Sequence, residues 1–347
     1  MTRIEEFDYE LPNELIAQTP LAVREASKLL VDRGSKDPSH HFVRDLVNLV
    51  EPGDLIVVND TKVLAARIFT TRPTGGKTEV LLLEPVGPAP VALRSQRSQW
   101  TALVKPSKKV APGTALSVDA DIDLSIVVGE DLGEGRRRVV IESENLEAAL
   151  AAVGQMPLPP YITEQLNEPD RYQTVYAHNP GSAAAPTAGL HLTEDLLARL
   201  VASGVQVATV ELVVGLDTFR PVTVEELDDH QMHSERYVVP EQTSEAVERT
   251  RVNNGSVIAV GTTTVRALES AARSGNTGAT DLFIRDPFDF RVVDRLLTNF
   301  HMPKSTLLVM IDAFVGPRWR HLYDVALSSD YRFLSFGDAM LLDRWAE

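Results

Sequence analysis

The stretch HQMHSE, from His230 to Glu235, places two imidazoles, a hydroxyl and a carboxylate within six residues. Histidine titrates near neutral pH and Glu235 could orient or tune it, so the pattern favours a general acid–base cluster. Two other interpretations stay open, because His230 and His233 could share a zinc ion or lie on a surface turn. No HExxH motif and no fixed third ligand accompany them, so we expect no metal site.

Two further polar clusters follow apolar runs, and ligands of open α/β sheets bind beyond the carboxyl ends of the strands. Asp60 follows the run at 54–59; it could act as a base, or it could only form the turn that ends the strand. In the stretch APTAGLH, Gly189 lets backbone approach a ligand, and His191 stands just before a predicted helix. The other interpretation of His191 is a hydrogen-bonded structural histidine.

Two more polar clusters stand beside later apolar runs. Thr262, Thr263 and Arg266 lie in GTTTVR, at a predicted strand-to-helix turn where hydroxyls and helix N–H groups can bind an anion. The threonines could equally be plain N-caps. Asn299 and His301 lie in TNFHMP, and their side chains suit contacts with a base edge or a ribose.

The elements that must position these residues alternate between strands and helices. Apolar runs predict strands at 29–31, 54–59, 205–214, 256–260 and 306–311. Helices are predicted after Thr193, which can act as an N-cap, over 241–252, and from the GTTT turn to Ala272. This alternation is typical of an α/β fold with a mixed or parallel sheet and flanking helices.

Between about residues 63 and 140 the pattern changes to short apolar runs separated by Gly and Pro turns, which predicts a small β-barrel or sandwich. We therefore expect an α/β catalytic domain at 1–60 plus 155–347, interrupted by an inserted β-barrel domain at 61–154. Residues 61–141 hold 12 Lys and Arg against 8 Asp and Glu, whereas the rest holds 22 against 41. The basic segment is either a landing surface for a polyanion or only a solvated face. The candidate contacts are Lys105, Lys108, Lys109, Arg136, Arg137 and Arg138.

Composition limits the remaining possibilities. The 347 residues carry a net charge of −15, which taken alone argues against a nucleic-acid partner. The chain has no cysteine, which excludes disulfides, thiolate nucleophiles, cysteine-ligated zinc and iron–sulfur clusters. No stretch approaches the length of a membrane span, and the start lacks the basic and apolar regions of a signal peptide. We therefore expect a cytoplasmic protein with no membrane partner, and we favour a monomer.

Seven stretches of the chain, taken in order, resemble the S-adenosylmethionine:tRNA ribosyltransferase-isomerase family of queuosine synthesis. They are FDYELPNELIAQTPLAVREASKLLV, PGDLIVVNDTKVLAAR, ALVKPSKKVAPGT, RYQTVYAHNPGSAAAPTAGLHLT, FRPVTVEELDDHQMHSERY, IAVGTTTVRALES and LLTNFHMPKSTLL. The resemblance covers nearly the whole chain. It implies an α/β domain interrupted by a β-barrel domain, which agrees with the change of pattern described above.

The resemblance implies a reaction that consumes S-adenosylmethionine as a substrate and needs no further cofactor. The ribosyl group moves to the aminomethyl group of 7-aminomethyl-7-deazaguanine in the anticodon loop of tRNA. Adenine and methionine leave, and epoxyqueuosine forms. In the route proposed for this family, a base removes a proton from ribose C5′, which the adjacent sulfonium makes acidic. The reaction also needs an acid for adenine, a clamp for methionine and a pocket for the nucleobase.

The resemblance also implies roles for the candidate residues, without assigning individual steps. The candidates for proton transfer are His191, His230, His233, Glu235 and Asp60. The candidates for substrate binding are Gly189, Thr262, Thr263, Arg266, Asn299 and His301.

Two positions depart from the pattern of the family, where LVVGLDTFRP stands in place of LHVGLGTFRP. Val213 replaces a histidine, which removes a proton carrier, and Asp217 adds a negative charge, which disfavours an incoming phosphate. These departures motivate an alternative, an S-adenosylmethionine-consuming enzyme of the same fold that acts on a small molecule or cleaves the sulfonium without tRNA. An RNA-binding protein without chemistry is less consistent with the retained HQMHSE, AGLH and TNFH motifs.

Overall fold

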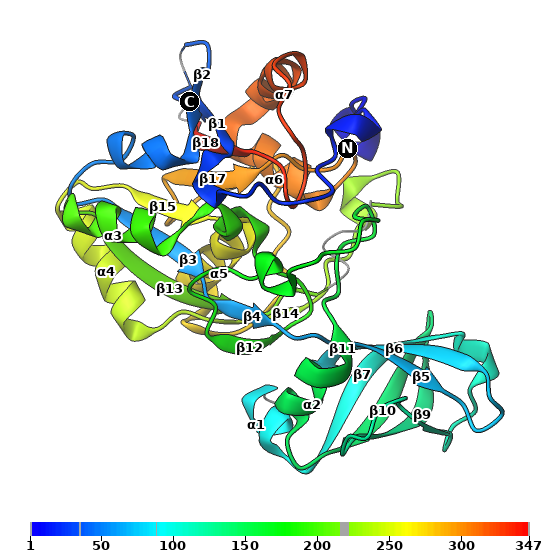
Figure 1. The fold of residues 1–347 in the computed structure, drawn as a ribbon. Helices are drawn as coiled ribbons and strands as arrows, with labels where there is room; N and C mark the ends of the chain where they lie inside the picture. The colour runs from blue at the N-terminus through cyan, green and yellow to red at the C-terminus, as the bar shows by residue number, and fades with distance from the viewer. Residues whose placement is uncertain (1, 35, 88, 216–221, 346–347) are drawn as a thin grey trace. The chain divides into compact units, whose positions relative to one another are not determined.

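The chain forms two compact units in the computed structural model, which describes residues 2–34, 36–87, 89–215 and 222–345 (Figure 1). The larger unit contains Met1–Asp60, Pro159–Ala177 and Pro186–Glu347. The smaller unit contains Thr61–Leu158 and His178–Ala185. The chain therefore leaves the larger unit directly after Asp60, the residue predicted to follow a buried strand.

Within its described residues, the larger unit contains a nine-stranded mixed sheet in the order β16-β14-β13-β3-β15-β17-β18-β1-β2. The neighbours β13, β3, β15 and β17 run parallel to one another, whereas β14 and β18 pair antiparallel with β13 and β17. In chain order the strands are β1 (Lys28–Asp32), β2 (Ser39–Phe42), β3 (Leu55–Asn59), β13 (Gln206–Leu212), β14 (Glu235–Val238), β15 (Val257–Val260), β16 (Thr277–Thr280), β17 (Arg295–Asn299) and β18 (Ala339–Asp343).

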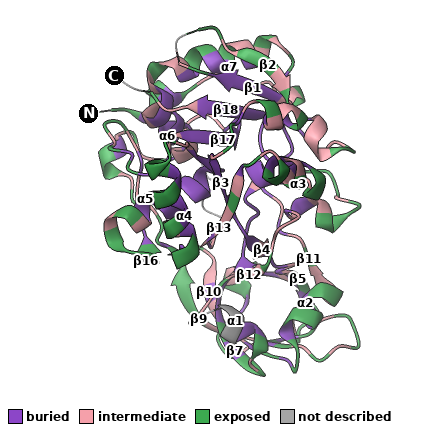
Figure 2. Ribbon diagram, turned by 90° about the vertical axis from the view of Figure 1, so that its left-hand side faces the viewer, coloured by how far each residue is buried: buried purple, intermediate pink, exposed green. Residues whose placement is uncertain are grey.

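Helices lie on both faces of this sheet, with α3 on one side of the strands and α4 and α5 on the other (Figure 2). The helices are α3 (Glu194–Ala202), α4 (Glu241–Val252), α5 (Thr262–Ser274), α6 (Thr306–Val315) and α7 (Trp319–Ser328). Leu196 and Leu200 of α3 belong to the same apolar core as Ile56 and Val58 of β3. The predicted mixed α/β architecture is confirmed. No helix among the described residues combines the length and the apolar character needed to cross a bilayer.

Capping side chains determine where two of the helices begin. Thr193 caps α3, since its side chain accepts a hydrogen bond of 3.0 Å from the backbone N–H of Leu196, as predicted. The predicted strand at 306–311 is wrong, because these residues begin α6. Ser305 caps α6 by accepting from the backbone N–H of Leu308 at 3.2 Å. A short apolar run does not distinguish a buried helix from a buried strand, which explains the error.

Within its described residues, the smaller unit contains a seven-stranded antiparallel sheet in the order β11-β5-β6-β7-β10-β9-β8, and a separate parallel pair, β12-β4. The strands are β4 (Thr61–Val63), β5 (Arg67–Thr71), β6 (Lys77–Pro85), β7 (Arg97–Lys105), β8 (Ala115–Leu116), β9 (Ser125–Gly133), β10 (Arg136–Glu142), β11 (Gly154–Gln155) and β12 (Asn179–Ser182). The helices are α1 (Ala89–Arg94) and α2 (Leu146–Val153). Thr71 and Ser117 exchange two backbone hydrogen bonds of 2.8 and 3.0 Å, which connect the end of β5 to the chain just after β8. A closed barrel remains a prediction.

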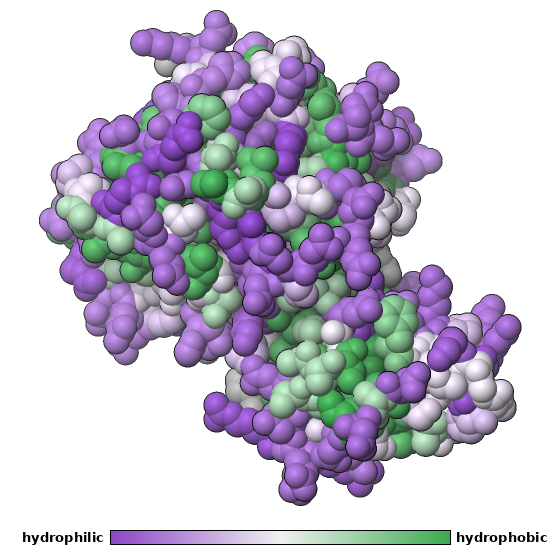
Figure 3. Space-filling model, viewed as in Figure 1, coloured by the Kyte–Doolittle hydropathy of each residue, from purple (hydrophilic) through white to green (hydrophobic). Residues whose placement is uncertain are grey.

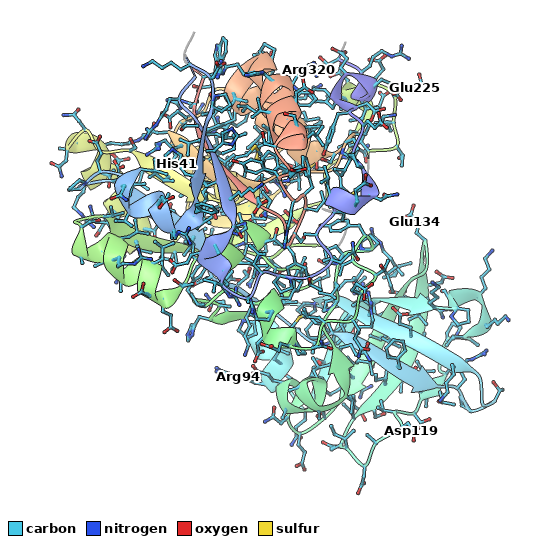
Figure 4. All side chains as sticks on the ribbon, turned by 45° about the horizontal axis from the view of Figure 1, so that its top comes forward. His41, Arg94, Asp119, Glu134, Glu225 and Arg320 are labelled. Carbon is cyan, nitrogen blue, oxygen red and sulfur yellow. The ribbon has the colours of Figure 1, made fainter. Side chains whose placement is uncertain are left out.

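The surface of the smaller unit combines apolar, acidic and basic side chains. Apolar side chains gather in one area of its visible face, with hydrophilic side chains around them (Figure 3). The acidic Asp119 and Glu134 point outward from this unit (Figure 4).

Candidate active site

The four polar clusters predicted after apolar runs meet at one edge of the nine-stranded sheet. Because β3, β15 and β17 are parallel, their carboxyl ends lie at the same edge. Asn59 ends β3, Gly261 follows β15, Asn299 ends β17, and the 3-10 helix η7 (Thr187–His191) packs against the end of β17. We call the following residues the rim cluster: Asn59, Asp60, Gly189, His191, Gly261, Thr262, Thr263 and Asn299.

Direct contacts connect the members of the rim cluster. Asn59 Nδ2 donates to Thr263 Oγ1 at 3.3 Å and to the backbone oxygen of Leu212 at 2.9 Å. At Gly261 φ is 87°, a conformation that favours glycine, and a Cβ atom there would stand 3.6 Å from Cβ of Ala188. The turn that starts α5 therefore packs closely on η7.

His191 is joined to Asn299 across the rim. Its Nε2 lies 3.1 Å from Asn299 Nδ2, and an amide nitrogen can only donate, so Nε2 accepts and the neutral ring carries its proton on Nδ1. Burial is the main cause that lowers the pKa of His191 to about 4, followed by the charges of Arg332 and Arg24. The ring is therefore neutral at pH 7 and presents Nδ1–H as a donor.

A small pocket of the larger unit opens beside His191, with a cavity volume of about 20 Å³. Arg24 and Arg171 bring two guanidinium groups to its wall. Arg24 Nη1 donates to the backbone oxygen of Leu190 at 3.0 Å, and Arg171 Nη2 donates to that of Leu21 at 2.5 Å. Burial, followed by the charge of Arg171, lowers the pKa of Arg24. Two like charges held by neutral oxygens give the pocket a positive potential that suits an anion.

Gly189 is enclosed by side chains of the same unit. A Cβ atom at this position would stand 1.9 Å from the hydroxyl oxygen of Tyr176 and 3.0 Å from Cγ2 of Thr174. Any side chain would displace Tyr176, so the position requires glycine. The predicted approach of a ligand to the backbone of Gly189 remains a prediction, and a tyrosine hydroxyl faces this residue.

Asp60, Thr262 and Thr263 stand at the rim as predicted from their place after strands. Asp60 is 9% exposed, and its backbone N–H donates to the backbone oxygen of Val210 at 3.0 Å, which continues the pairing of β3 with β13. Thr262 and Thr263 are the first residues of α5, where backbone N–H groups have no acceptor within the helix. This end of α5 therefore offers donors at the rim.

Glu235 and Arg266 form a buried ion pair, with each side chain 6% exposed. Glu235 begins β14; its Oε2 accepts from Arg266 Nη1 and its Oε1 accepts from the backbone N–H of Gly215 at 3.1 Å. Arg266, on α5, also donates to the backbone oxygens of Leu282 at 3.2 Å and Thr280 at 3.3 Å. The pair links β14 to α5, and direct contact of either residue with a substrate remains a prediction.

The two histidines of HQMHSE lie nearer to solvent than Glu235 does. The ring of His230 packs edge-on against Phe283, with centroids 5.3 Å apart, and His233 is exposed. Burial, followed by the charge of His233, lowers the pKa of His230. Among the described residues, no group of three or more His, Cys, Asp or Glu side chains is arranged to hold a metal ion.

His301 follows β17 closely in sequence but has surroundings different from those of His191. Its Nε2 lies 3.1 Å from Thr298 Oγ1. Its backbone N–H donates to the hydroxyl of Tyr323 at 2.9 Å, and its backbone oxygen accepts from the hydroxyl of Tyr9 at 2.5 Å. Burial lowers its pKa to about 3. These contacts tie His301 into an aromatic cluster, which favours a structural role over the predicted contact with a substrate.

Most of the predicted polyanion contacts lie at accessible positions of the smaller unit. Lys105 is exposed at the end of β7, and Lys108 and Lys109 are exposed in the following 3-10 helix. Arg136 and Arg138 are half-buried on one face of β10. Arg138 Nη1 also donates to Thr101 Oγ1 at 3.1 Å, and its Nε lies 3.7 Å from Glu130 Oε1, so its guanidinium is partly engaged within the unit.

Arg137 differs from the other predicted polyanion contacts because it faces inward. Successive side chains of a strand point to opposite faces, and Arg137 is 2% exposed. Its guanidinium donates to the backbone oxygens of Val110 at 2.8 Å, Gly129 at 2.8 Å and Ser107 at 3.2 Å. This arrangement holds neighbouring loops together and leaves no part of the side chain for an external phosphate.

The two departures from the family pattern have different places in the structure. Val213 lies just after β13, and its backbone N–H donates to the backbone oxygen of Arg236 at 3.0 Å. Asp217 lies outside the described residues. The backbone pairing at Val213 does not depend on which side chain stands there.

Arg24, Arg171 and Tyr176 belong to this site, although sequence reasoning did not single them out. Arg24 lies in a short 3-10 helix before β1, and Arg171 lies in another, Pro169–Tyr172. None of the three follows a predicted strand, so the rule that looks for ligands at strand ends does not find them. Their only signal in the sequence was membership of the long stretches that resemble a known family.

Comparisons with known proteins cover both units and the whole rim cluster. A family model described as "Queuosine biosynthesis protein" matches residues 4–342. The chain is 49% identical to the S-adenosylmethionine:tRNA ribosyltransferase-isomerase of Azoarcus sp. (strain BH72) and 48% identical to the protein of that name from Rubrobacter xylanophilus, in each case over 98% of this chain and 97% of the relative. It is also similar to the crystal structure of an S-adenosylmethionine tRNA ribosyltransferase from Thermotoga maritima, with a TM-score of 0.55 and 37% identity over 97% of this chain and 99% of that one. On this evidence the chain belongs to the queuosine biosynthesis protein family.

Proposed function

We propose that this protein is an S-adenosylmethionine:tRNA ribosyltransferase-isomerase. It transfers and isomerises the ribosyl group of S-adenosylmethionine onto the aminomethyl group of 7-aminomethyl-7-deazaguanine in tRNA. The products are epoxyqueuosine in the tRNA, adenine and methionine. The observation that carries this proposal is the similarity, over nearly the whole chain, to proteins of that name.

The pocket beside His191 suits the methionine part of S-adenosylmethionine. Arg24 and Arg171 line this pocket, and guanidinium groups bind carboxylates through pairs of N–H donors. Arg24 and Arg171 therefore hold this carboxylate. Arg266 is engaged with Glu235, so it positions α5, while Thr262 at the start of that helix offers donors to the rest of the substrate.

The hydrogen bonds of the rim distinguish roles in proton transfer. Because Nε2 of His191 accepts from Asn299, the neutral ring can donate a hydrogen bond through Nδ1–H, which suits stabilisation of the departing adenine. Asp60, a carboxylate at the end of β3, suits the base that removes the C5′ proton. Asn299 is a positioning residue, since it fixes the tautomer of His191. His230 and His233 are the remaining candidates for proton transfer, on the side of β14, whereas Glu235 is held in its ion pair with Arg266.

The smaller unit, which adds 155–158 and 178–185 to the predicted 61–154, is proposed to be the inserted β-barrel domain and to bind tRNA. The hydrogen bonds between Thr71 and Ser117 support closure of its sheet, because they connect strands from opposite parts of the strand order. Exposed Lys105, Lys108 and Lys109 supply positive charge for the phosphates of an anticodon loop.

We further propose that the protein acts as a monomer in the cytoplasm. S-adenosylmethionine is its substrate, and it uses no other cofactor. The names of its relatives support S-adenosylmethionine as the substrate.

The reaction itself tests the proposal. Purified protein incubated with S-adenosylmethionine and tRNA that carries the aminomethyl base should release adenine and increase the mass of the tRNA. Matched incubations omit the tRNA or use tRNA with an unmodified guanine. Adenine released without RNA would support the small-molecule alternative, which the names of the relatives do not favour. Neither adenine nor a change in mass would refute the proposal.

A further inference from the structure

The hydroxyl group of Tyr176 is buried but has no hydrogen-bond partner among the residues that the structure describes. The tyrosine packs against the apolar core that contains Ala188 and Leu192, which restrains the ring. Buried hydroxyls without a partner are rare in folded proteins, because they lose water without gaining another hydrogen bond. This hydroxyl therefore needs an explanation that the fold alone does not supply.

The Tyr176 hydroxyl lies beside Gly189, a member of the rim cluster. It faces Gly189, where a Cβ atom would stand only 1.9 Å away, and Gly189 belongs to the same short helix as His191. Thr174, on the same segment, also has a buried hydroxyl oxygen with no partner among the described residues. Hydroxyl groups without a protein partner thus gather on the segment that faces the candidate active site.

The ionisation of Tyr176 limits what its hydroxyl can do. Burial is the main cause that raises its pKa; the charge of Arg24 lowers the pKa and that of Asp60 raises it. The hydroxyl is therefore protonated at neutral pH and can both donate and accept a hydrogen bond. A group of this kind suits a lasting hydrogen bond to a ligand better than the transfer of a proton.

We infer that Tyr176 is a substrate-binding residue whose hydroxyl hydrogen-bonds a polar atom of the ribose or purine of a bound 5′-sulfonium nucleoside. The inference rests on the proposed function, which supplies S-adenosylmethionine as that nucleoside. The ligand gives the hydroxyl the partner that the protein does not provide, and the absence of a Cβ atom at Gly189 leaves room for the hydroxyl itself. Because the bond forms with the bound substrate, its loss weakens binding rather than the chemical step.

The substitution Tyr176→Phe removes only the hydroxyl group. We expect the Kd for S-adenosylmethionine, and its KM in the adenine-release assay with modified tRNA, to rise roughly 10-fold, with little change in kcat. The pH profile should keep its shape, and the melting temperature should stay the same or rise, because no protein hydrogen bond is lost.

The matched control is Tyr237→Phe. The hydroxyl of Tyr237 donates to the backbone oxygen of Gly275 at 2.8 Å, so the same chemical change breaks a bond within the protein. This variant should melt at a lower temperature and keep the wild-type Kd and KM.

Wild-type Kd and KM in Tyr176→Phe would overturn the inference, whatever the melting temperature, because the hydroxyl would then meet only water. A fall in kcat with unchanged KM would also overturn it, since that result would assign a proton transfer. The wild-type protein, measured in the same assays, distinguishes a failure of the inference about Tyr176 from a failure of the proposed function. If wild-type protein neither binds S-adenosylmethionine nor releases adenine, the proposed function fails and the inference falls with it.

Discussion

His191 and His301 lie near the carboxyl end of the same strand, β17, and burial lowers the pKa of both. His191 accepts a hydrogen bond from Asn299 and borders a pocket with two guanidinium groups. His301 is bonded to Thr298 and tied to two tyrosines. A lowered pKa therefore reports burial in both regions and does not by itself indicate catalysis. The pocket beside His191 is what makes that region the candidate active site.

The largest expected effect separates the two histidines directly. His191→Ala should lower kcat/KM for adenine release by roughly 100- to 1,000-fold, because it removes a hydrogen-bond donor from the reacting centre. His301→Ala should lower the melting temperature and leave kcat/KM of the folded protein within about threefold of wild type. Both variants are assayed for adenine release after their folded fraction is measured by circular dichroism. Equal losses of kcat/KM would abolish the distinction between the two regions.

Substitutions in the Glu235–Arg266 pair should, like His301→Ala, lower the stability of the fold more than the activity of the folded protein. Glu235→Ala leaves an arginine buried without its partner, so we expect the free energy of unfolding to fall by roughly 3–5 kcal/mol. The double variant Glu235→Ala/Arg266→Ala should lose less than the two single losses combined. Urea denaturation measures these values. If Glu235→Ala keeps its stability but loses activity, Glu235 belongs with His191 as a group that acts on the substrate.

The pH dependence of stability tests the enclosed state of His301. Its pKa is lowered to about 3 in the folded protein, against roughly 6.5 when unfolded, so the unfolded chain binds more protons between these values. The free energy of unfolding should therefore fall as the pH drops below about 6.5, with a slope of up to ~1.4 kcal/mol per pH unit from this group. His301→Phe should flatten the slope in urea titrations between pH 7 and pH 5. An unchanged slope would mean that His301 is accessible and charged in the folded protein.

In the smaller unit, exposed Lys108 and Lys109 should differ from buried Arg137 in the same way, with smaller effects on activity. Lys108→Glu/Lys109→Glu should raise the KM for tRNA roughly 10-fold and reduce its dependence on salt concentration, because exposed charges contact phosphates. The KM for S-adenosylmethionine should not change. Arg137→Gln should instead destabilise the protein, since Arg137 bonds three loop oxygens. A purely tRNA-specific defect in Arg137→Gln would contradict its enclosed position.

The sequence predicted those features of the fold that depend on neighbouring residues along the chain. The uninterrupted apolar run before Asp60 indicated a strand buried on both faces, and β3 is buried along its length. Thr193 indicated a helix start and caps α3. Polar residues after apolar runs indicated the rim, because the ends of parallel strands meet at one edge.

The remaining features depend on contacts between distant segments, which no local pattern encodes. The run after Ser305 is apolar all round because it is buried between other elements, so its helical period was hidden. Arg137 stands in a run of three arginines, and only the pairing of β10 reveals that it faces inward. Arg24 and Tyr176 reach the rim from segments without regular pattern, and their roles follow from three-dimensional proximity alone.

The most direct test of the account is a crystal structure of the protein with bound S-adenosylmethionine. We predict the methionine carboxylate between the guanidinium groups of Arg24 and Arg171, and a polar atom of the nucleoside within about 3 Å of the Tyr176 hydroxyl. The ring of His191 should present Nδ1 to the ligand. Electron density for the ligand beside His301, or anywhere outside the rim cluster and its pocket, would contradict the assignment of the active site.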